Sequence, residues 1–262
     1  MRYLLDEWTN VARRFKAAEY ILLLIDYDGT LTPIVNRPEL AVLSSDTRKL
    51  LRKLAKNRHY IIGIISGRAL SDLKSKIGLD DLIYAGNHGL EIEGLGSSFL
   101  EPVAAEMQPL FDMLHRALSA TTRSIRGVFV ENKGLTLSVH YRMAEAKEED
   151  KVKDVFQKVT DPLHVTGRIR ITQGKKVYEI RPPVDWNKGK AVTWLMAKLK
   201  DSSKKRRILP VYLGDDLTDE DAFNVVNKIH GISIVVGEDN IDSVAQYFLK
   251  SPEEVTYFLK ML

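Results

Sequence analysis

An α/β fold with a largely parallel sheet and an inserted α/β domain is predicted for this chain of 262 residues. Apolar runs of strand length alternate with amphipathic helical stretches as far as about residue 90, which is the pattern of a parallel sheet. From about residue 106 to about residue 182 the pattern changes to hairpins and helices, and past Pro182-Pro183 the first pattern returns. We therefore expect a core domain of residues 1–105 and 183–262 around an inserted domain of residues 106–182.

The first half of the expected core opens with an amphipathic helix, because apolar residues between Leu4 and Phe15 recur at helical spacing. Tyr20–Ile25 is an apolar run, as a buried strand of a parallel sheet would be. Ser45 or Asp46 is suited to cap the next helix. The elements expected after this strand are a helix carrying Leu50, Leu51 and Leu54, a strand at 60–65, a helix carrying Leu70, Leu73 and Ile77, and a strand at 82–85.

The inserted segment reads as an α+β unit, and Asn132-Lys133-Gly134 has the turn residues of a hairpin. Its expected elements are a helix at 107–118, strands at 128–130 and 135–140, a helix at 147–159, and strands at 168–172 and 177–180. The core then resumes with a helix at 190–199, a strand at 209–213, a helix from Asp219 and a strand at 232–236.

Composition limits the classes of function. A net charge of +4 is modest for this length, and the one dense basic run, 204–207, lacks interleaved aromatics, so a solvated loop is favoured over a nucleic-acid site. The absence of cysteine excludes disulfides, thiolate metal sites and a cysteine nucleophile. The charged residues among the first 19 do not form a signal peptide, and the longest apolar run is too short for a bilayer. We expect a soluble, cytoplasmic protein without nucleic-acid or membrane partners.

The most informative motif is Asp26-Tyr27-Asp28-Gly29-Thr30, which directly follows the first buried strand. In open α/β sheets ligands bind outside the carboxyl ends of the strands. Side chains at i and i+2 share a face, so both carboxylates can reach one metal or one phosphorus atom. Gly29 permits a sharp turn, and Thr30 places a hydroxyl nearby. A simple strand-ending turn is the alternative for this motif taken alone.

Later core strands also end in polar groups that suit a phosphate site. Ser66-Gly67-Arg68 follows the second strand where a helix is expected to begin, so Ser66 either binds an anion or caps that helix. Lys188 lies at a helix start, where a cation is unfavourable unless a phosphate or solvent compensates it. Segment 214–221 holds five acids, with Thr218 and Asp221 at capping-box spacing, and a hard divalent cation would relieve their repulsion.

Together these groups predict phosphoryl transfer. Asp26, Asp215 and the backbone carbonyl of Asp28 can bind Mg²⁺, and Asp26 can attack phosphorus to give an aspartyl-phosphate. Asp28 can protonate the leaving oxygen and then activate water. Ser66 and Lys188 would hold the phosphoryl oxygens.

The ordered set Asp26-x-Asp28-Gly29-Thr30, Ser66, Lys188 and Gly214-Asp215-Asp216 resembles the four motifs of the haloacid-dehalogenase (HAD) superfamily of aspartate phosphatases. With Gly86-Asn87-His88-Gly89, Glu179-x-Arg181-Pro182 and the rest of segment 214–220, the chain looks like the trehalose-6-phosphate phosphatase family over nearly its whole length. The resemblance implies a Rossmann-like core, a C2-type α/β cap that closes over the sugar, and Mg²⁺ as cofactor.

The resemblance also implies a set of site residues. The catalytic residues it implies are Asp26, Asp28, Ser66 and Lys188. The metal residues are Asp26, Asp28, Asp215, Asp216 and Asp219. Which of Asp216 and Asp219 contacts the metal directly is left open. The core residues for substrate are Thr30, Gly67, Arg68, Asn87 and His88, of which the last three either contact the sugar or hold the domain interface. The cap residues for the distal glucose are Glu131, Lys133, Arg142, Lys176 and Glu179, with a solvated hairpin tip as the alternative for Glu131 and Lys133.

The function implied is Mg²⁺-dependent hydrolysis of a small-molecule substrate, trehalose 6-phosphate, to trehalose and phosphate. The sequence does not give the oligomeric state, for which a monomer is expected. Other sugar phosphates, such as those of glucosylglycerol, sucrose or mannosylglycerate, remain open as substrates. So does a non-catalytic sugar-phosphate sensor or a partner subunit of a trehalose-phosphate synthase, although the paired Asp26 and Asp28 argue against it. A glycosidase would leave Lys188 and the acids of 215–221 without a role. A phosphomutase or a P-type phosphoryl carrier would share the aspartyl-phosphate.

Overall fold

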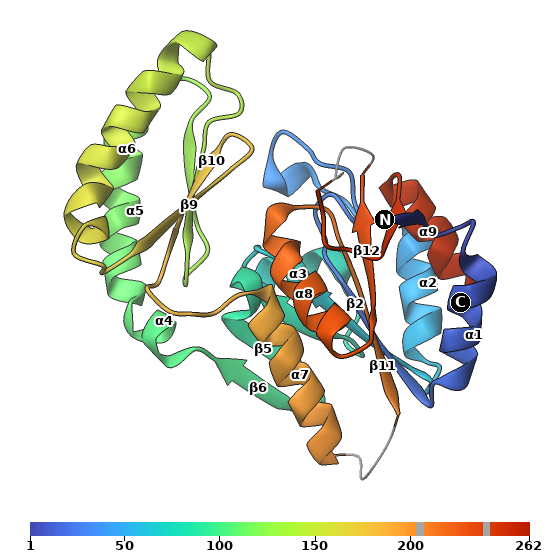
Figure 1. Cartoon of the computed structure of the whole chain (residues 1–262). Coiled ribbons are helices and arrows are strands. Elements are labelled where there is room, and N and C mark those ends of the chain that lie inside the picture. The colour runs from blue at the N-terminus through green and yellow to red at the C-terminus, as the bar shows by residue number, and fades with distance from the viewer. Residues whose placement is uncertain (203–206, 238–241) are drawn as a thin grey trace. The chain divides into compact units, whose positions relative to one another are not determined.

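The computed structural model describes residues 1–202, 207–237 and 242–262, so most of the basic run at 204–207 lies outside the described residues. The chain divides into two compact units (Figure 1). The first consists of Met1–Phe99 and Trp186–Leu262, and the second is Leu100–Asp185. Among the described residues, no helix combines the length and the apolar character needed to cross a membrane.

The first unit is built on one sheet, in which β2, β3, β4 and the strands β11 to β13 run parallel. In the described residues its strand order is β1 (Arg2–Tyr3), β13 (Tyr247–Leu249), β12 (Ile232–Val236), β11 (Ile208–Gly214), β2 (Tyr20–Ile25), β3 (Tyr60–Ile65), β4 (Ile83–Gly86), β5 (Glu91–Gly94) and β6 (Ser97–Leu100). The parallel sheet whose two halves are separated by an insertion is therefore confirmed. Strand β5 extends the sheet by pairing antiparallel with β4, and this antiparallel extension was not expected.

Helices cover both faces of this sheet (Figure 1). On one face lie α1 (Trp8–Ala17), α2 (Ser45–Ala55), α3 (Leu70–Ile77) and α9 (Pro252–Met261), and on the other lie α7 (Lys188–Ser202) and α8 (Glu220–Lys228). Short 3₁₀ turns are η1 (Pro38–Leu40), η2 (Asn87–Gly89) and η4 (Leu217–Asp219). Ser44 caps α2 by accepting from the N–H of Thr47, one residue before the expected cap.

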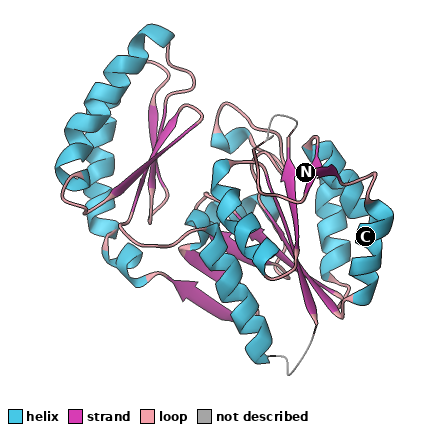
Figure 2. Cartoon of the chain, viewed as in Figure 1, coloured by secondary structure: helices cyan, strands magenta, loops and turns pink. Residues whose placement is uncertain are grey.

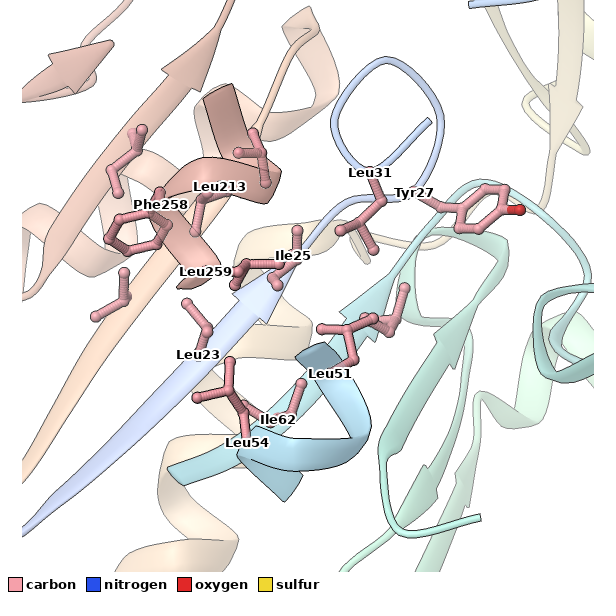
Figure 3. Close-up of a cluster of buried hydrophobic side chains, with 14 of the residues drawn as sticks. Leu23, Ile25, Tyr27, Leu31, Leu51, Leu54, Ile62, Leu213, Phe258 and Leu259 are labelled. Atoms are coloured by element: carbon pink, nitrogen blue, oxygen red, sulfur yellow. The ribbon is translucent and has the colours of Figure 1, made fainter. Parts of the chain in front are cut away.

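Alternate residues of β2 enter the two cores, because successive side chains of a strand point to opposite faces. Leu23 and Ile25 pack with Leu54 and Phe258 in the core shown in Figure 3. Leu22 and Leu24 pack in the second core, toward α7 and α8. Both sets are fully buried, which explains why the strand is apolar throughout.

The second unit has an antiparallel sheet with two long helices on one side of it (Figure 2). Its strands are β7 (Phe129–Asn132), β8 (Leu137–His140), β10 (Val177–Arg181) and β9 (Arg170–Gly174) in spatial order, and its helical elements are α4 (Pro102–Glu106), α5 (Gln108–Thr122), η3 (Ala146–Glu148) and α6 (Glu149–His164). The hairpin at Asn132-Lys133-Gly134 is confirmed, since it joins β7 to β8 and Gly134 has a φ of +80°.

Candidate active site

Strands β2 and β11 are parallel neighbours that end at the same edge of the sheet, and an aspartate follows each of them. Ile25 lies opposite Leu213, and the N–H of Asp26 donates to the Leu213 carbonyl at 2.9 Å. Ligand oxygens of Asp26, Asp215 and Asp219 all lie within 4.8 Å of one another, a grouping able to hold a metal ion. The structure thus brings three of the acids named from the sequence together at one point.

Lys188, the first residue of α7, lies buried among these acids. Its Nζ donates to Asp26 Oδ1 at 2.9 Å and to Asp219 Oδ1 at 2.7 Å. Burial opposes the charge, but the carboxylates of Asp219 and Asp26 raise the pKa of Lys188 well above its ordinary value. The ammonium at this helix start is therefore compensated by two carboxylates rather than by solvent.

Asp219 has no solvent exposure and accepts four hydrogen bonds. Lys188 Nζ and the Tyr212 hydroxyl both donate to Oδ1 at 2.7 Å. The backbone N–H groups of Asp215 and Asp216 donate to Oδ2 at 3.0 and 3.1 Å. Burial of Tyr212 raises the pKa of its hydroxyl well above the ordinary value, so the hydroxyl keeps its proton and donates. All four acceptor positions of Asp219 are thus used by the protein.

The capping box of this segment lies two residues before the one expected. Asp216 caps η4 by accepting from the N–H of Thr218 at 2.9 Å, and Asp219 returns a bond to the N–H of Asp216. Thr218 and Asp221 do not form the box, since α8 starts at Glu220 and its cap residue, Asp219, accepts no capping hydrogen bond from the N–H groups of α8. The expectation failed because the chain inserts a 3₁₀ turn between the strand and the helix.

Asp26 and Asp215 have pKa values that are raised by burial and by the neighbouring carboxylates. Burial raises the pKa of Asp26 well above its ordinary value, even though Lys188 opposes the shift. Burial, together with the charges of Asp216 and Asp219, raises the pKa of Asp215 to about 8. One lysine does not neutralise three clustered carboxylates, so the site favours an additional cation.

The turn after β2 is shaped to accommodate Asp215. Gly29 has a φ of +84°, and a Cβ there would lie 2.1 Å from Asp215 Oδ2. Only glycine therefore lets this carboxylate lie against the turn. The hydroxyl of Thr30 donates to Asp215 Oδ1 at 3.4 Å, so Thr30, which the resemblance assigned to substrate, contacts a candidate metal residue here.

The side chain of Asp28 pairs with Arg68. Nε and Nη2 of Arg68 donate to the two carboxylate oxygens of Asp28, each at 2.7 Å. Nη1 donates to Asp72 at 2.7 Å, and Nη2 also donates to the Pro38 carbonyl at 2.8 Å. The guanidinium lies over the Tyr27 ring, 5.2 Å from its centroid. The resemblance assigned Arg68 to substrate, whereas here it holds Asp28 in a two-bond fork.

Arg68→Lys is expected to reduce kcat about tenfold and to lower the melting temperature, because an ammonium cannot make the planar fork to Asp28 or hold Asp72 and the Pro38 carbonyl at once. Phosphate release and a thermal melt measure the two effects. Arg37→Lys is the matched control, since Arg37 is exposed and pairs with Glu39 at 3.8 Å. Equal kcat in the two variants would contradict the view that Arg68 positions Asp28.

Ser66 does not cap a helix, and no helix begins at Ser66-Gly67-Arg68. Helix α3 begins at Leu70, and its cap position, Ala69, has no side-chain hydrogen bond. The carboxylate of Glu91 instead accepts from the N–H of Leu70 at 2.8 Å. Ser66 Oγ accepts from the N–H of Arg68 at 3.2 Å, within a loop that separates β3 from the helix. The helix start expected at Ser66-Gly67-Arg68 therefore lies at Leu70 instead.

Asn87 and His88 form a left-handed turn next to Ser66, with φ values of 48° and 58°. The N–H of His88 donates to the Ser66 carbonyl at 2.9 Å, and Asn87 Nδ2 donates to Glu91 at 2.8 Å. The His88 ring lies against Gly67, where a Cβ would be 2.7 Å from Nε2. These residues, Gly67 included, thus share one loop cluster beside β3.

In the second unit, three cap residues named from the sequence lie on the sheet face opposite the helices. Glu131 and Glu179 both align with Ser138 on β8, while the alternate residues of these strands pack in the core. Lys133 Nζ donates to Glu179 Oε1 at 3.3 Å. His140 Nε2 lies 2.8 Å from Glu131 Oε2. The resemblance did not name His140 or Ser138.

Arg142 and Lys176 lie toward the other end of the β8–β10 ladder from Lys133. Arg142 donates to the Lys175 carbonyl at 3.1 Å, and Lys176 pairs with Glu149.

Comparison with known proteins decides the family. Residues 24–253 match the family model described as Trehalose-phosphatase. The chain belongs to the trehalose-phosphatase family. It is therefore a phosphoric monoester hydrolase, and the recognised resemblance is confirmed.

Relatives of this trehalose-phosphatase extend over most of its length. Probable trehalose-phosphate phosphatase 4 of Oryza sativa subsp. japonica is 37% identical over 98% of this chain and 70% of its own length. Probable trehalose-phosphate phosphatase E of Arabidopsis thaliana is 39% identical over 92% of this chain and 70% of its own length. The solved C-terminal domain of C. albicans trehalose-6-phosphate phosphatase has a TM-score of 0.81 at 27% identity, covering 97% of this chain and 95% of that one. The expected fold, a parallel-sheet HAD core with an inserted α/β domain, is confirmed.

Proposed function

We propose that this chain is a Mg²⁺-dependent phosphatase that hydrolyses trehalose 6-phosphate through an aspartyl-phosphate on Asp26. The single observation that carries the proposal is the cluster at the carboxyl edge of the sheet, in which Asp215 joins the buried Asp26, Lys188 and Asp219. Membership of the trehalose-phosphatase family and the names of its relatives support the substrate. A cytoplasmic location and a synthase partner remain expectations of the same proposal.

The residues present fit a divalent cation. The raised pKa values of Asp26 and Asp215 reflect buried negative charge that a cation would compensate. Asp219 has no acceptor position left, and the Asp28 side chain is held by Arg68. We therefore assign the cation to the carboxylates of Asp26 and Asp215 and to the backbone carbonyl of Asp28. When bound, Mg²⁺ would supply positive charge to the phosphoryl oxygens.

The protein groups account for the bonds made and broken. A carboxylate oxygen of Asp26 forms a bond to phosphorus as the bond from phosphorus to the sugar oxygen breaks. In its acid form Asp28 gives a proton to that leaving oxygen, and the resulting carboxylate, the form that Arg68 holds, takes one from the water that hydrolyses the aspartyl-phosphate. Lys188 holds phosphoryl oxygens with its ammonium, and Ser66 with its hydroxyl. Phosphate leaves, and the Asp26 carboxylate is restored.

We assign residues 1–105 and 183–262 to the hydrolase core and residues 106–182 to a cap that recognises the sugar. Glu131, Lys133 and Glu179 offer acceptors and a donor on one sheet face, which is the chemistry that sugar hydroxyls require. We assign Arg142 and Lys176, at the other end of the β8–β10 ladder, to the same recognition of the sugar.

Phosphate release with Mg²⁺ and with EDTA tests the proposal across the phosphates of trehalose, sucrose, glucosylglycerol, mannosylglycerate and glucose. We expect metal-dependent turnover that is fastest on trehalose 6-phosphate. Preference for another sugar phosphate would retain the core chemistry and refute the assigned cap specificity. The absence of turnover on every compound would refute the enzyme and favour a sugar-phosphate sensor or a synthase partner.

A further inference from the structure

Tyr212 is the one aromatic residue in strand β11, whose other side chains are aliphatic. It lies on the face of the sheet covered by α7 and α8, as Leu24 does on the neighbouring strand. The residue is fully buried, and its ring packs edge-on against Phe223 with 5.7 Å between the centroids. A buried tyrosine hydroxyl needs a hydrogen-bond partner, and here that partner is the carboxylate of Asp219.

The hydroxyl shares its acceptor with the site lysine. Tyr212 and Lys188 both donate to the same oxygen, Asp219 Oδ1, and Lys188 also donates to Asp26. Two backbone N–H groups hold the other oxygen of Asp219, so its carboxylate cannot turn. A continuous series of hydrogen bonds therefore joins Tyr212 to Asp26 through Asp219 and Lys188.

We propose that Tyr212 is a positioning residue that keeps the Lys188 ammonium at Asp26 by sharing the charge of Asp219 Oδ1. Without the hydroxyl, the ammonium would be the one remaining donor to that oxygen among the described residues and would be drawn toward Asp219. The distance from Nζ to Asp26 would then increase, and the ammonium would be less available to the phosphoryl oxygens. This inference rests on the proposed function, since Lys188 and Asp26 are the groups on which it acts.

The test compares Tyr212→Phe with Tyr84→Phe. Tyr84 is a matched control because it is also buried in this sheet, and its hydroxyl donates to the Leu79 carbonyl rather than to the site. Each substitution removes one buried hydroxyl, so we expect both to lower the melting temperature, Tyr212→Phe by more because its acceptor is a carboxylate. We expect kcat to fall about tenfold in Tyr212→Phe alone, since a charge-assisted bond is lost, with KM changed less than about twofold.

A second variant provides an independent measurement if Tyr212→Phe folds poorly. Replacing Tyr212 with 3,5-difluorotyrosine keeps both the ring and the donor, so kcat should stay within about threefold of the wild type. Equal kcat for Tyr212→Phe and Tyr84→Phe, or a fluorinated variant as slow as Tyr212→Phe, would overturn the proposal. If the wild-type protein showed no turnover, the proposed function itself would be refuted. That result is obtained before any substitution is made, so it is distinguishable from a failure of the Tyr212 proposal.

Discussion

Asp26→Asn is expected to lower kcat by at least about 10³-fold, because an amide oxygen is a far weaker nucleophile than a carboxylate. The substitution should preserve the fold, since the amide has nearly the same size and its oxygen can still accept the 2.9 Å bond from Lys188. Burial raises the pKa of Asp26, which means that the folded protein disfavours its ionised form. The melting temperature should therefore be equal to or above that of the wild type.

Two measurements separate chemistry from folding. Phosphate release gives kcat, and quenching the enzyme with labelled substrate should trap phosphate on the wild type but not on Asp26→Asn. Asp81→Asn is the matched control, because Asp81 is exposed in the loop between α3 and β4. If Asp26→Asn retained more than about a tenth of the wild-type kcat while Asp81→Asn were normal, Asp26 would not be the nucleophile.

The position of the site could be predicted because parallel strands place their carboxyl ends at one edge. Asp26 and Asp215 each follow an apolar run of strand length, so their approach follows from topology alone. The partner of Asp28 could not be predicted in this way. Whether a carboxylate faces a metal or an arginine depends on side-chain rotamers, and Arg68 lies 40 residues along the chain.

Tyr212 was missed although the sequence contains a signal for it. A tyrosine inside a buried aliphatic strand indicates a hydroxyl that needs a partner, and Gly214, two residues on, shares its face. The partner itself is not evident from spacing, because the turn η4 that brings Asp219 back over the strand was not predicted.

Most strands and helices of the fold were predicted, but several short strands and the last helix were not. Strands β5, β6 and β13 span three or four residues each, too few for alternation to be distinguished from a loop. The last helix, α9, was also missed, although Pro252 at its first turn is a helix-start signal. In the second unit, the side chains of β8 alternate, so Ser138 lies on one face of the sheet while Leu137 and Val139 lie on the other face, in the core.

Lys188→Met is expected to destabilise the protein by about 3–5 kcal/mol, because removing one partner leaves the buried carboxylates of Asp26 and Asp219 without their cation. Methionine approximates the length of the lysine stem, so packing at the start of α7 should change little. Turnover should fall at least about 10²-fold through loss of the charge at the phosphoryl oxygens. Chemical denaturation and phosphate release measure the two effects on the same preparation.

Adding Asp219→Asn to Lys188→Met separates the structural role of the lysine from its catalytic role. The asparagine oxygen can accept from the N–H groups of Asp215 and Asp216, and its amide nitrogen can donate to the hydroxyl oxygen of Tyr212. The double variant then buries one charge fewer, so at least half of the lost stability should return. Turnover should not return, because the phosphoryl oxygens still lack the ammonium. If the double variant recovered turnover together with stability, Lys188 would act only by stabilising the fold. If Lys188→Met alone were as stable as the wild type, the two carboxylates would not need their cation.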